Sequence, residues 1–379
     1  MKILKKIIIR NDLITGGGVE NVMYNLIMYM LKRDYDITVV TDSGTSDEFY
    51  NIFPREVKFI RSSYNRKKIR RATPQWVIDR TKYLLYRAYF GLQLQKKFDI
   101  AIAMKEGHSM MAVSKMRTIK KYAWVHVDYD AHYWTKYVFP GPEEERKCMR
   151  NFDQVICVSN ATMKSVKHVI GDPGNLCVRY NPINYIEIRK KAEEFPDLDR
   201  PQRKLLFVAV GRLSEQKNYL MLLDVFGKLE KRYGNNIELW IVGEGKQRRE
   251  LEGKIERSGI SCIQLLGERK NPYPIIKMAD CVISASKSES YGLAIQEAFI
   301  LGIPVVATKC PALEEIFDHR FGILTVNTET GLLQALMEIM QNAEILKKYR
   351  ENIKQFYDCE SLYTQRLKKI CDLWEQGNE

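Results

Sequence analysis

Short apolar runs alternate with amphipathic helical patterns along the chain, and this alternation is the feature that most constrains the fold. Segments such as 19–33 and 219–234 place apolar residues at helical spacing. Strands that alternate with helices form parallel sheets covered on both faces, so the sequence predicts an α/β protein. The runs of strand length are 5–9, 36–41, 57–60, 99–104, 122–127, 154–159 and 177–180, then 204–210, 237–242, 262–267, 281–286 and 303–308.

A polar, charged stretch separates the two series of strands. At 379 residues the chain is long enough for two domains of ordinary size. We therefore predict two Rossmann-like domains, at 1–184 and 204–355, joined by a linker at 185–203.

Composition and targeting signals restrict the class of protein. Hydrophobic residues make up 45% and charged residues 28%, which is typical of a globular chain. The eight cysteines are scattered without a CxxC pair, which favours a reducing compartment over a disulfide scaffold or a zinc site. The apolar run Ile7–Ile9 is too short for an export signal, and no run is long enough to span a membrane. The sequence predicts a cytoplasmic protein.

Most of the net charge of +13 lies at 61–97, where eleven Lys or Arg residues accompany a single acid, Asp79. Aromatic side chains such as Trp76 and Tyr86 are interleaved with the charge. This pattern is typical of a solvated helix that packs on the core, or of a contact with an anionic membrane surface. The membrane alternative would place the protein peripherally on the inner face of the cell membrane. Nucleic acid is disfavoured because no recognised binding motif accompanies the charge.

The run GGGVE at 16–20 follows the first predicted strand and opens a helix. Glycines such as Gly17 and Gly18 let the backbone approach a ligand closely, and a helix N-terminus favours an anion. The run lacks the GxGxxG spacing of nicotinamide-binding proteins, and a plain turn explains it equally well.

Two further candidates follow strands of the second series. The run VGRLSEQKN places Arg212 and Lys217 after a strand, where two cations suit a diphosphate. The run SKSESYGL follows another strand and leads into a helix, whose first amides could also hold a phosphate. These amides belong to Ser290, Tyr291, Gly292 and Leu293.

Glu289 and Glu297 stand eight positions apart, the first before the turn and the second on the helix. Eight helical positions span about 12 Å, which approximates the distance from ribose to sugar across a diphosphate. Two carboxylates at that separation could accept hydrogen bonds from hydroxyls at both ends of one ligand. Taken alone, the pair is better explained by a helix-dipole contact at Glu289 and a solvated Glu297.

Together these motifs resemble the retaining glycosyltransferases of family 4, which have the GT-B fold of two Rossmann-like domains facing each other across a cleft. The resemblance covers nearly the whole chain, and the ordered set is more specific than any one motif. In this family the final helix often crosses back onto the first domain, and 356–379 resembles that segment. The motifs are GGGVENVMYNLI, WVHVD, VSNATMKSV, NPIN, VGRLSEQKN, IVGEGKQRREL, LLG and SESYGLAIQEAFILGIPVVAT, and the last contains the family's Glu-x7-Glu pattern.

The resemblance implies a role for each matching residue. Arg212 and Lys217 would neutralise the diphosphate of a nucleotide-sugar donor as it departs, helped by the amides from Ser290 to Leu293. Glu297 would bind the ribose, and Glu289 would bind the donor sugar near its reacting carbon.

Residues of the first domain would complete the site. The resemblance implies that His126, in WVHVD, contacts the donor sugar and that Gly17 and Gly18 close over the phosphates. The family offers no obvious enzyme nucleophile, so positioning and charge stabilisation would carry most of the rate.

One feature competes with this assignment, and another departs from the family pattern. Asp128 and Asp130 form an Asp-x-Asp pattern, which metal-dependent transferases of a different fold use to hold a divalent ion. Here the pattern follows the histidine within a GT-B-like order, which argues against a metal. Ser290 and Tyr291 replace the Gly-Phe that is frequent in the family, which leaves the choice of donor sugar open.

The resemblance implies a hexosyltransferase that uses a nucleotide-diphospho-sugar, with a UDP-sugar favoured over a GDP-sugar. The acceptor would be a glycan or a lipid-linked molecule in bacterial surface polysaccharide or glycolipid synthesis, and neither a cofactor nor a metal is expected. Two alternatives stay open. One is a nucleotide-sugar epimerase of the same fold, against which the Arg–Lys pair and Glu-x7-Glu argue; the other is a catalytically silent partner of a membrane complex.

Overall fold

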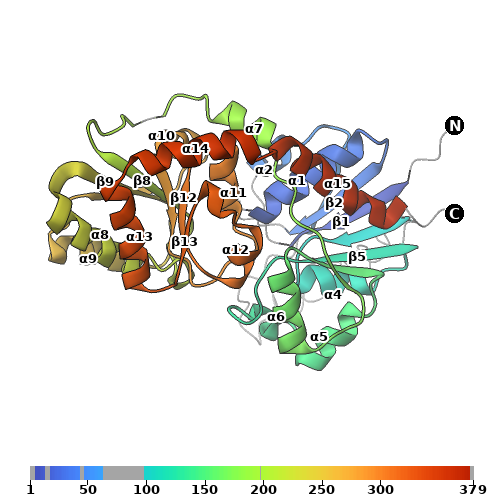
Figure 1. Cartoon of the computed structure of the whole chain (residues 1–379). Coiled ribbons are helices and arrows are strands. Elements are labelled where there is room, and N and C mark those ends of the chain that lie inside the picture. The colour runs from blue at the N-terminus through green and yellow to red at the C-terminus, as the bar shows by residue number, and fades with distance from the viewer. Residues whose placement is uncertain (1–4, 13–17, 43–46, 63–97, 197, 376–379) are drawn as a thin grey trace, which may run out of the picture. The chain divides into compact units, whose positions relative to one another are not determined.

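The computed structural model describes residues 5–12, 18–42, 47–62, 98–196 and 198–375 (Figure 1). The chain divides into two compact units: unit 1 consists of Met1–Pro182 with Arg366–Glu379, and unit 2 of Ile183–Gln365. Each unit contains a parallel sheet between helices, so the predicted pair of Rossmann-like domains is confirmed. The stretch 185–203, which we expected to be a linker, lies in unit 2 and contains helix α7 (Tyr185–Lys191).

The described part of unit 1 is built on a parallel sheet in the order β3-β2-β1-β4-β5-β6-β7. The central strand β1 is apolar at consecutive positions, and Ile7, Ile8 and Ile9 are at most 1% exposed. A strand covered on both faces has no solvent side, which explains this unbroken apolar run. The strands are β1 (Lys6–Arg10), β2 (Asp36–Asp42), β3 (Lys58–Ser62), β4 (Ile100–Ala103), β5 (Lys120–Val125), β6 (Gln154–Cys157) and β7 (Leu176–Val178).

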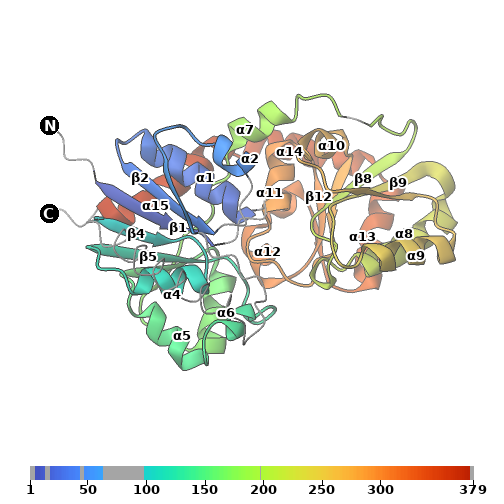
Figure 2. The ribbon, with the colours of Figure 1, turned by 180° about the vertical axis from the view of Figure 1, so that it is seen from behind.

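Helices cover both faces of the unit 1 sheet (Figures 1 and 2). On one face, Tyr122 of β5 donates a hydrogen bond to the Leu373 carbonyl at 2.7 Å and packs edge-on against Trp374. This contact holds the end of α15, a helix that begins in unit 2 and whose residues from Arg366 onward belong to unit 1. The helices are α1 (Gly18–Leu31) and α15 (Cys359–Glu375) on that face, α4 (His108–Ser114), α5 (Pro142–Met149) and α6 (Asn160–Ile170) on the other, with α2 (Asp47–Asn51) and the 3-10 turn η1 (Trp134–Tyr137).

Unit 2 contains a second parallel sheet, in the order β10-β9-β8-β11-β12-β13. Its chain order reverses between β8 and β11, just as that of unit 1 reverses between β1 and β4. Strand β13 is an element that the sequence analysis missed. The strands are β8 (Leu205–Val210), β9 (Ile237–Val242), β10 (Ile263–Gly267), β11 (Cys281–Ser284), β12 (Val305–Thr308) and β13 (Gly322–Thr325).

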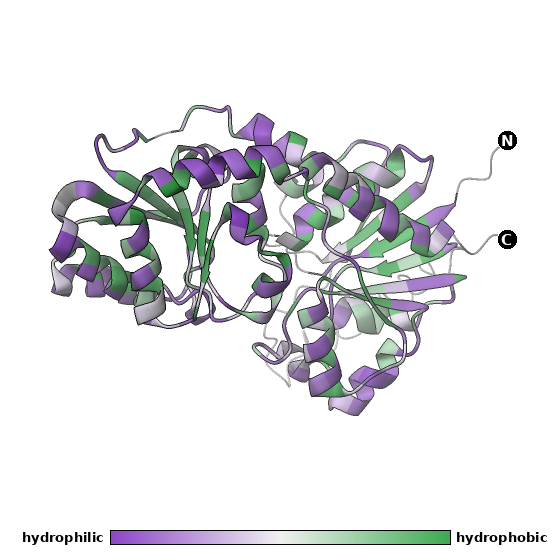
Figure 3. Ribbon diagram, viewed as in Figure 1, coloured by the Kyte–Doolittle hydropathy of each residue, from purple (hydrophilic) through white to green (hydrophobic). Residues whose placement is uncertain are grey.

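Two apolar clusters fix the helices of unit 2 on its sheet. On one face the rings of Phe207 and Phe226 meet at 5.5 Å, and on the other Phe299 packs against Phe317 and Phe321. Figure 3 shows apolar strands between helices whose outer sides are polar. The first face is covered by α8 (Tyr219–Tyr233), α9 (Arg248–Ser258) and α13 (Glu329–Gln341), and the second by α10 (Tyr273–Met278), α11 (Leu293–Ile300), α12 (Pro311–Ile316) and part of α14 (Glu344–Phe356).

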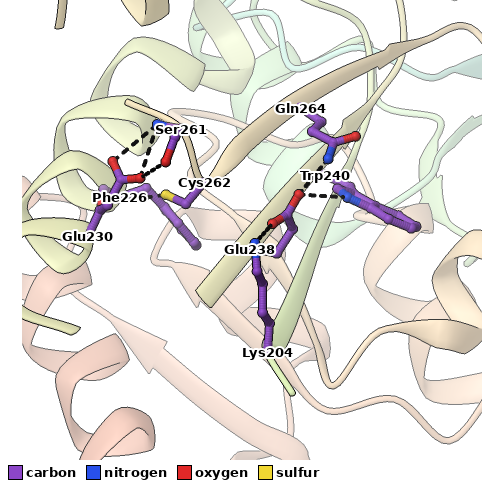
Figure 4. Close-up of polar contacts among 8 residues, drawn as sticks. All are labelled: Lys204, Phe226, Glu230, Glu238, Trp240, Ser261, Cys262 and Gln264. Atoms are coloured by element: carbon purple, nitrogen blue, oxygen red, sulfur yellow. Dashed lines mark hydrogen bonds and ion pairs between the residues drawn. The ribbon is translucent and has the colours of Figure 1, made fainter. Parts of the chain in front are cut away.

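A buried ion pair lies where the unit 2 strands begin (Figure 4). The carboxylate of Glu238, the second residue of β9, is 3% exposed and accepts hydrogen bonds from three side chains. Lys204 Nζ donates at 2.8 Å, Gln264 Nε2 at 2.6 Å and Trp240 Nε1 at 3.3 Å. Lys204 directly precedes β8, Trp240 lies on β9 with Glu238, and Gln264 is the second residue of β10, so this amino-edge cluster (Lys204, Glu238, Trp240 and Gln264) ties three neighbouring strands together.

The state of the cysteines and the hydropathy of the helices relate to the cellular compartment that the sequence predicts. All eight cysteines are free thiols, and seven of them are buried. Burial raises the pKa of the Cys281 thiol to about 12, so this residue behaves as a small apolar core side chain. No helix in the described part of the chain is long and apolar enough to cross a membrane.

Candidate active site

Most of the predicted site residues fall on two loops of unit 2. The loop after β8 carries Arg212 and Lys217, and the loop after β11 carries Glu289 and leads into α11, which carries Glu297. β8 and β11 are neighbours in the sheet, and the strand order reverses between them. Ligands of doubly wound sheets bind beyond the carboxyl ends of the strands at such a reversal. The predicted donor residues of unit 2 therefore lie where this fold binds ligands.

The loop after β8 carries one exposed cation and one partly buried cation. Gly211 begins the loop, and a Cβ there would lie 2.9 Å from Lys217 Cε, so glycine leaves room for the lysine side chain. Tyr219 fixes the backbone, because its hydroxyl donates to the Gly211 carbonyl at 3.2 Å. Arg212 is exposed and forms no ion pair with any residue that the structure describes. Its guanidinium is available to an anionic ligand.

Lys217 and Glu289 form an ion pair that joins the two loops. Lys217 Nζ lies 2.6 Å from Glu289 Oε1, and the two side chains are 20% and 13% exposed. Ser286 Oγ donates to the same oxygen at 2.7 Å. The Ser286 carbonyl in turn accepts hydrogen bonds from Thr308 Oγ1 and Asn327 Nδ2. Glu289 is therefore held in place by the protein, and its Oε2 has no hydrogen bond from the described residues.

Helix α11 begins at a turn that requires glycine. Gly292 has φ 68°, in the left-handed region, and a Cβ there would lie 2.5 Å from Leu313 Cδ2. Tyr291 is 3% exposed, and its carbonyl accepts from Gln296 Nε2 at 3.3 Å. The first amides of a helix have no partner within the helix, so Leu293 and its neighbours supply donors at the end of the sheet that carries Arg212.

Glu297 is partly buried on the second turn of α11. The Tyr273 hydroxyl, from α10, donates to its Oε1 at 3.3 Å. Burial raises the pKa of Glu297 to about 7, and the Tyr273 hydrogen bond and the charge of Lys217 offset part of that rise. Glu297 therefore changes charge near neutral pH and lies within electrostatic reach of Lys217.

His126 follows β5 in unit 1, and its backbone N–H donates to Glu106 Oε2 at 3.0 Å. Glu106 is fully buried and also accepts from Trp134 Nε1 at 2.9 Å. Burial and the charge of Lys105 lower the pKa of His126 to about 3, so its ring is neutral at pH 7. His126 Nε2 is buried without a hydrogen-bond partner among the described residues. A neutral imidazole ring with one unused nitrogen can form one hydrogen bond with a ligand through that nitrogen.

Two predictions fall wholly or partly outside the described residues. Gly17 is not described, whereas Gly18 is the first residue of α1. The basic segment 61–97 is described only at residues 61 and 62, where the Arg61 guanidinium lies 3.9 Å from the centroid of the Tyr50 ring. The membrane contact of this segment stays a prediction.

The two carboxylates of the alternative metal site have protein partners. Asp128 Oδ1 accepts from the Asp130 N–H at 3.0 Å and closes a turn. Asp130 Oδ1 lies 2.5 Å from His168 Nδ1. Within the ranges that the structure describes, no three His, Cys, Asp or Glu side chains are grouped so that they could hold a metal ion.

Three residues contact predicted site residues but were missed in the sequence. Ser286 stands three positions before Glu289, and this short spacing is a local signal that could have identified it. Tyr273 and Glu106 are 24 and 20 positions from the residues that they contact, and no local pattern marks them. Only the packing of α10 on α11, and of β4 beside β5, brings these groups together.

Two family models match the chain in succession. The model described as Glycosyltransferase Family 4 matches residues 16–185, and the model described as Glycosyl transferases group 1 matches residues 190–356. The interval between the matches falls close to the division between unit 1 and unit 2.

Curated relatives match over different lengths. The alpha-monoglucosyldiacylglycerol synthase of Acholeplasma laidlawii is 22% identical over 392 residues, which cover 93% of this chain and 94% of that protein. A GDP-mannose-dependent alpha-(1-6)-phosphatidylinositol dimannoside mannosyltransferase of Mycobacterium tuberculosis is 25% identical over 195 residues, or 51% of each chain. The chain spans about half the length of several other curated relatives, including two from Methanocaldococcus jannaschii.

A solved structure supports the fold over the full length. Anabaena HepE, in complex with UDP and glucose, matches with a TM-score of 0.73 and 16% identity, covering 97% of this chain and 100% of that one. The two family matches, the full-length relative and this structure agree with one another. The chain belongs to the family 4 glycosyltransferases and has their GT-B fold.

Proposed function

We propose that this protein is a retaining glycosyltransferase that moves a hexose from a UDP-sugar to a glycan or lipid-linked acceptor. One observation carries the proposal: two cations and two carboxylates lie on the segments that follow β8 and β11, where the strand order of unit 2 reverses. A nucleotide-diphospho-sugar needs this combination, because its diphosphate is anionic and its ribose and sugar carry hydroxyls. We favour UDP over GDP as the nucleotide of the donor because HepE was solved with UDP and glucose, although a relative is named for GDP-mannose.

The proposed role of the cations is to stabilise the departing diphosphate. Arg212 is exposed and can bind two oxygens at once, and Lys217 can turn from Glu289 toward the phosphate. The amides at the start of α11 add further donors at the same end of the sheet. Charge that is already in position where negative charge develops is usually the largest contribution to catalysis.

The proposed roles of the carboxylates follow from their places in the motif. Glu297 accepts hydrogen bonds from the ribose, and Glu289 accepts them from the donor sugar near its reacting carbon. Lys217 and Ser286 already orient Glu289, which lowers the entropy cost of binding the sugar. His126 is neutral and has an unused nitrogen, so its role toward the sugar is a hydrogen bond and not a full charge.

The proposed reaction takes place on one face of the sugar. The bond from the anomeric carbon to the diphosphate oxygen breaks, and the acceptor oxygen forms its bond to that carbon from the same side. The acceptor proton passes to the departing phosphate oxygen, so no side chain needs to act as a nucleophile.

The acceptor class and cellular location are also proposed. Relatives named for glycolipid synthesis support an acceptor that is a lipid or is linked to one. We place the enzyme in the cytoplasm, with the basic segment 61–97 against the anionic inner face of the membrane. Co-sedimentation with anionic vesicles tests this location. A variant with Arg66, Lys67 and Lys68 changed to Gln should bind the vesicles more weakly than wild type.

The test of the proposed function separates nucleotide binding from sugar transfer. Calorimetry measures UDP affinity, and product analysis of a donor–acceptor reaction measures transfer and the configuration at the anomeric carbon. Glu289→Ala should abolish transfer but keep UDP binding, whereas Arg212→Ala should weaken UDP at least about tenfold. An inverted product would contradict the retaining mechanism, and absence of turnover with every donor would favour a silent partner.

A further inference from the structure

Tyr273 lies beside Glu297 on a separate helix. It opens α10, and its hydroxyl donates to Glu297 Oε1, on α11, at 3.3 Å. The Tyr273 ring packs against the apolar cluster that α10, α11 and α12 share. The apolar ring is therefore fixed by packing, and its hydroxyl is directed at the carboxylate.

The backbone of Tyr273 is also fixed. Pro272 and Pro274 flank it; each ring restricts its own φ, and Pro274 also limits the backbone of the residue before it, which is Tyr273. The Tyr273 N–H donates to Asn271 Oδ1 at 3.2 Å. Asn271 Nδ2 donates in turn to the Lys191 carbonyl and to a Glu194 carboxylate oxygen, each at 2.8 Å. A short, constrained loop therefore sets the position from which the hydroxyl reaches Glu297.

Toward the charged form of Glu297 the hydrogen bond has one direction. Burial, together with the Glu297 charge, raises the pKa of Tyr273 well above its ordinary value, so its hydroxyl keeps the proton and donates it to the carboxylate. A carboxylate offers about four lone-pair sites, and this bond uses one of those on Oε1. The others stay available to the ribose hydroxyls, in an orientation that Tyr273 determines.

We propose that Tyr273 is a positioning residue that aims the Glu297 carboxylate at the ribose of the donor nucleotide. This inference rests on the proposed function, because it takes Glu297 as the ribose ligand. Glu297 has several rotatable bonds, and without the Tyr273 hydroxyl its carboxylate would have to be ordered when the nucleotide binds. The loss would fall on ribose recognition and would spare the diphosphate contacts of Arg212 and Lys217.

Other charged groups near this pair affect its titration. Lys217 acts on Glu297, and Glu187 of α7 acts on Tyr273. Arg189, also on α7, donates to the Ile300 carbonyl at the end of α11. Tyr273 is the hydrogen-bond donor that stabilises the charged form of Glu297, so removing its hydroxyl should raise the pH at which Glu297 loses its proton.

Calorimetry with UDP and 2′,3′-dideoxy-UDP tests the proposal in wild type, Tyr273→Phe, Glu297→Gln and the double variant. The ratio of the two dissociation constants, dideoxy-UDP over UDP, measures ribose recognition. Tyr273→Phe keeps the ring and removes only the hydroxyl, so it should lower this ratio about fivefold and leave dideoxy-UDP binding unchanged. In the Glu297→Gln background the same change should have no effect on the ratio.

A pH series and a matched tyrosine complete the experiment. The midpoint at which the ratio rises with pH should move upward in Tyr273→Phe. Tyr233→Phe is the control, because the Tyr233 hydroxyl is buried without a hydrogen-bond partner among the described residues. It should leave both dissociation constants and the midpoint as in wild type.

Different outcomes overturn different claims. Equal weakening of UDP and dideoxy-UDP by Tyr273→Phe, or an unchanged ratio while Glu297→Gln lowers it, overturns the positioning role alone. Wild-type protein that binds neither UDP nor GDP overturns the proposed function and this inference with it. Wild-type binding with no preference for the intact ribose overturns the Glu297 assignment.

Discussion

Carboxylates lie at both ends of the unit 2 strands, and their hydrogen bonding differs. The amino ends of the strands form the amino edge of the sheet, and the carboxyl ends form its carboxyl edge. At the amino edge, the Glu238 side chain is 3% exposed and accepts three side-chain hydrogen bonds, one of them from Lys204 (Figure 4). At the carboxyl edge, Glu297 receives one described hydrogen bond, from Tyr273 at 3.3 Å, and its pKa is raised to about 7. Glu289 has an ion pair, but only one of its oxygens takes part.

This difference follows from what each edge does. A buried charge is tolerated when donors fill its coordination, and Glu238 then serves to hold three strands together. Carboxylates that must bind hydroxyls cannot have every lone pair filled by the protein. Their incomplete hydrogen bonding costs stability, which is the usual condition of a functional site. The amino edge therefore stabilises the unit, and the carboxyl edge keeps bonding capacity for a ligand.

The largest expected effect is on the amino edge. Glu238→Ala leaves the Lys204 ammonium, the Gln264 amide and the Trp240 indole N–H without their acceptor, and it should lower the stability of unit 2 by about 3 kcal/mol or more. Hydrogen exchange of the amides of β9 measures this local stability. UDP affinity, measured where the variant stays folded, should be unchanged. Glu297→Ala should give the reverse pattern, with weaker UDP binding and no loss of stability; a similar loss in both variants would break the comparison.

The second effect concerns Lys217 at the carboxyl edge. Lys217→Ala removes a cation from the diphosphate site and also leaves Glu289, 13% exposed, as an unpaired negative charge. Its UDP affinity should fall more than the roughly tenfold expected of Arg212→Ala. Adding Glu289→Gln to Lys217→Ala should restore part of the affinity, because the repulsive charge is gone. Calorimetry on the three variants decides this, and failure of the rescue would mean that the ion pair does not govern UDP binding.

The third effect is a pH dependence with two opposite signs. The pKa of Glu297 is raised from 4.5 to about 7, so its neutral form is favoured in the folded protein. The stability that this provides is complete below about pH 4.5 and is lost as the pH rises through about 7. Ribose binding needs the carboxylate, so the preference for UDP over dideoxy-UDP should instead grow as the pH rises through about 7. Thermal unfolding and calorimetry across this range should show both trends, and Glu297→Gln should remove both.

The strands were largely predictable because most of them contain a run of consecutive apolar residues, as at Ile7–Ile9 of β1. β13 escaped because it is a four-residue edge strand that begins with Gly322, and Ile323 and Thr325 are only half-buried. Such a run has no pattern that separates it from a loop. The return of the chain to unit 1 was expected at 356–379, but the division falls at Arg366, inside the continuous helix α15, and no local pattern marks it.

The site was predictable as a set of residues but not as a set of contacts. Glu289 and Glu297 share one motif, and Arg212 and Lys217 share another. The ion pair between Lys217 and Glu289 joins residues 72 positions apart, and it forms because β8 lies beside β11 in the sheet. Strand order is a property of the whole unit, so no local pattern contains it.

The smallest expected effect is that of removing divalent metal. Arg212, Lys217 and the amides of α11 already supply positive charge to the departing diphosphate, so a metal ion would add little. UDP affinity and sugar transfer should change less than about twofold when a chelator is added. Asp130→Asn should also have little effect on transfer, because Asp130 is paired with His168. Strict dependence on Mg²⁺ or Mn²⁺ would show that the protein's own cations are insufficient. The positive charge at the carboxyl edge would then have to come partly from a bound metal ion.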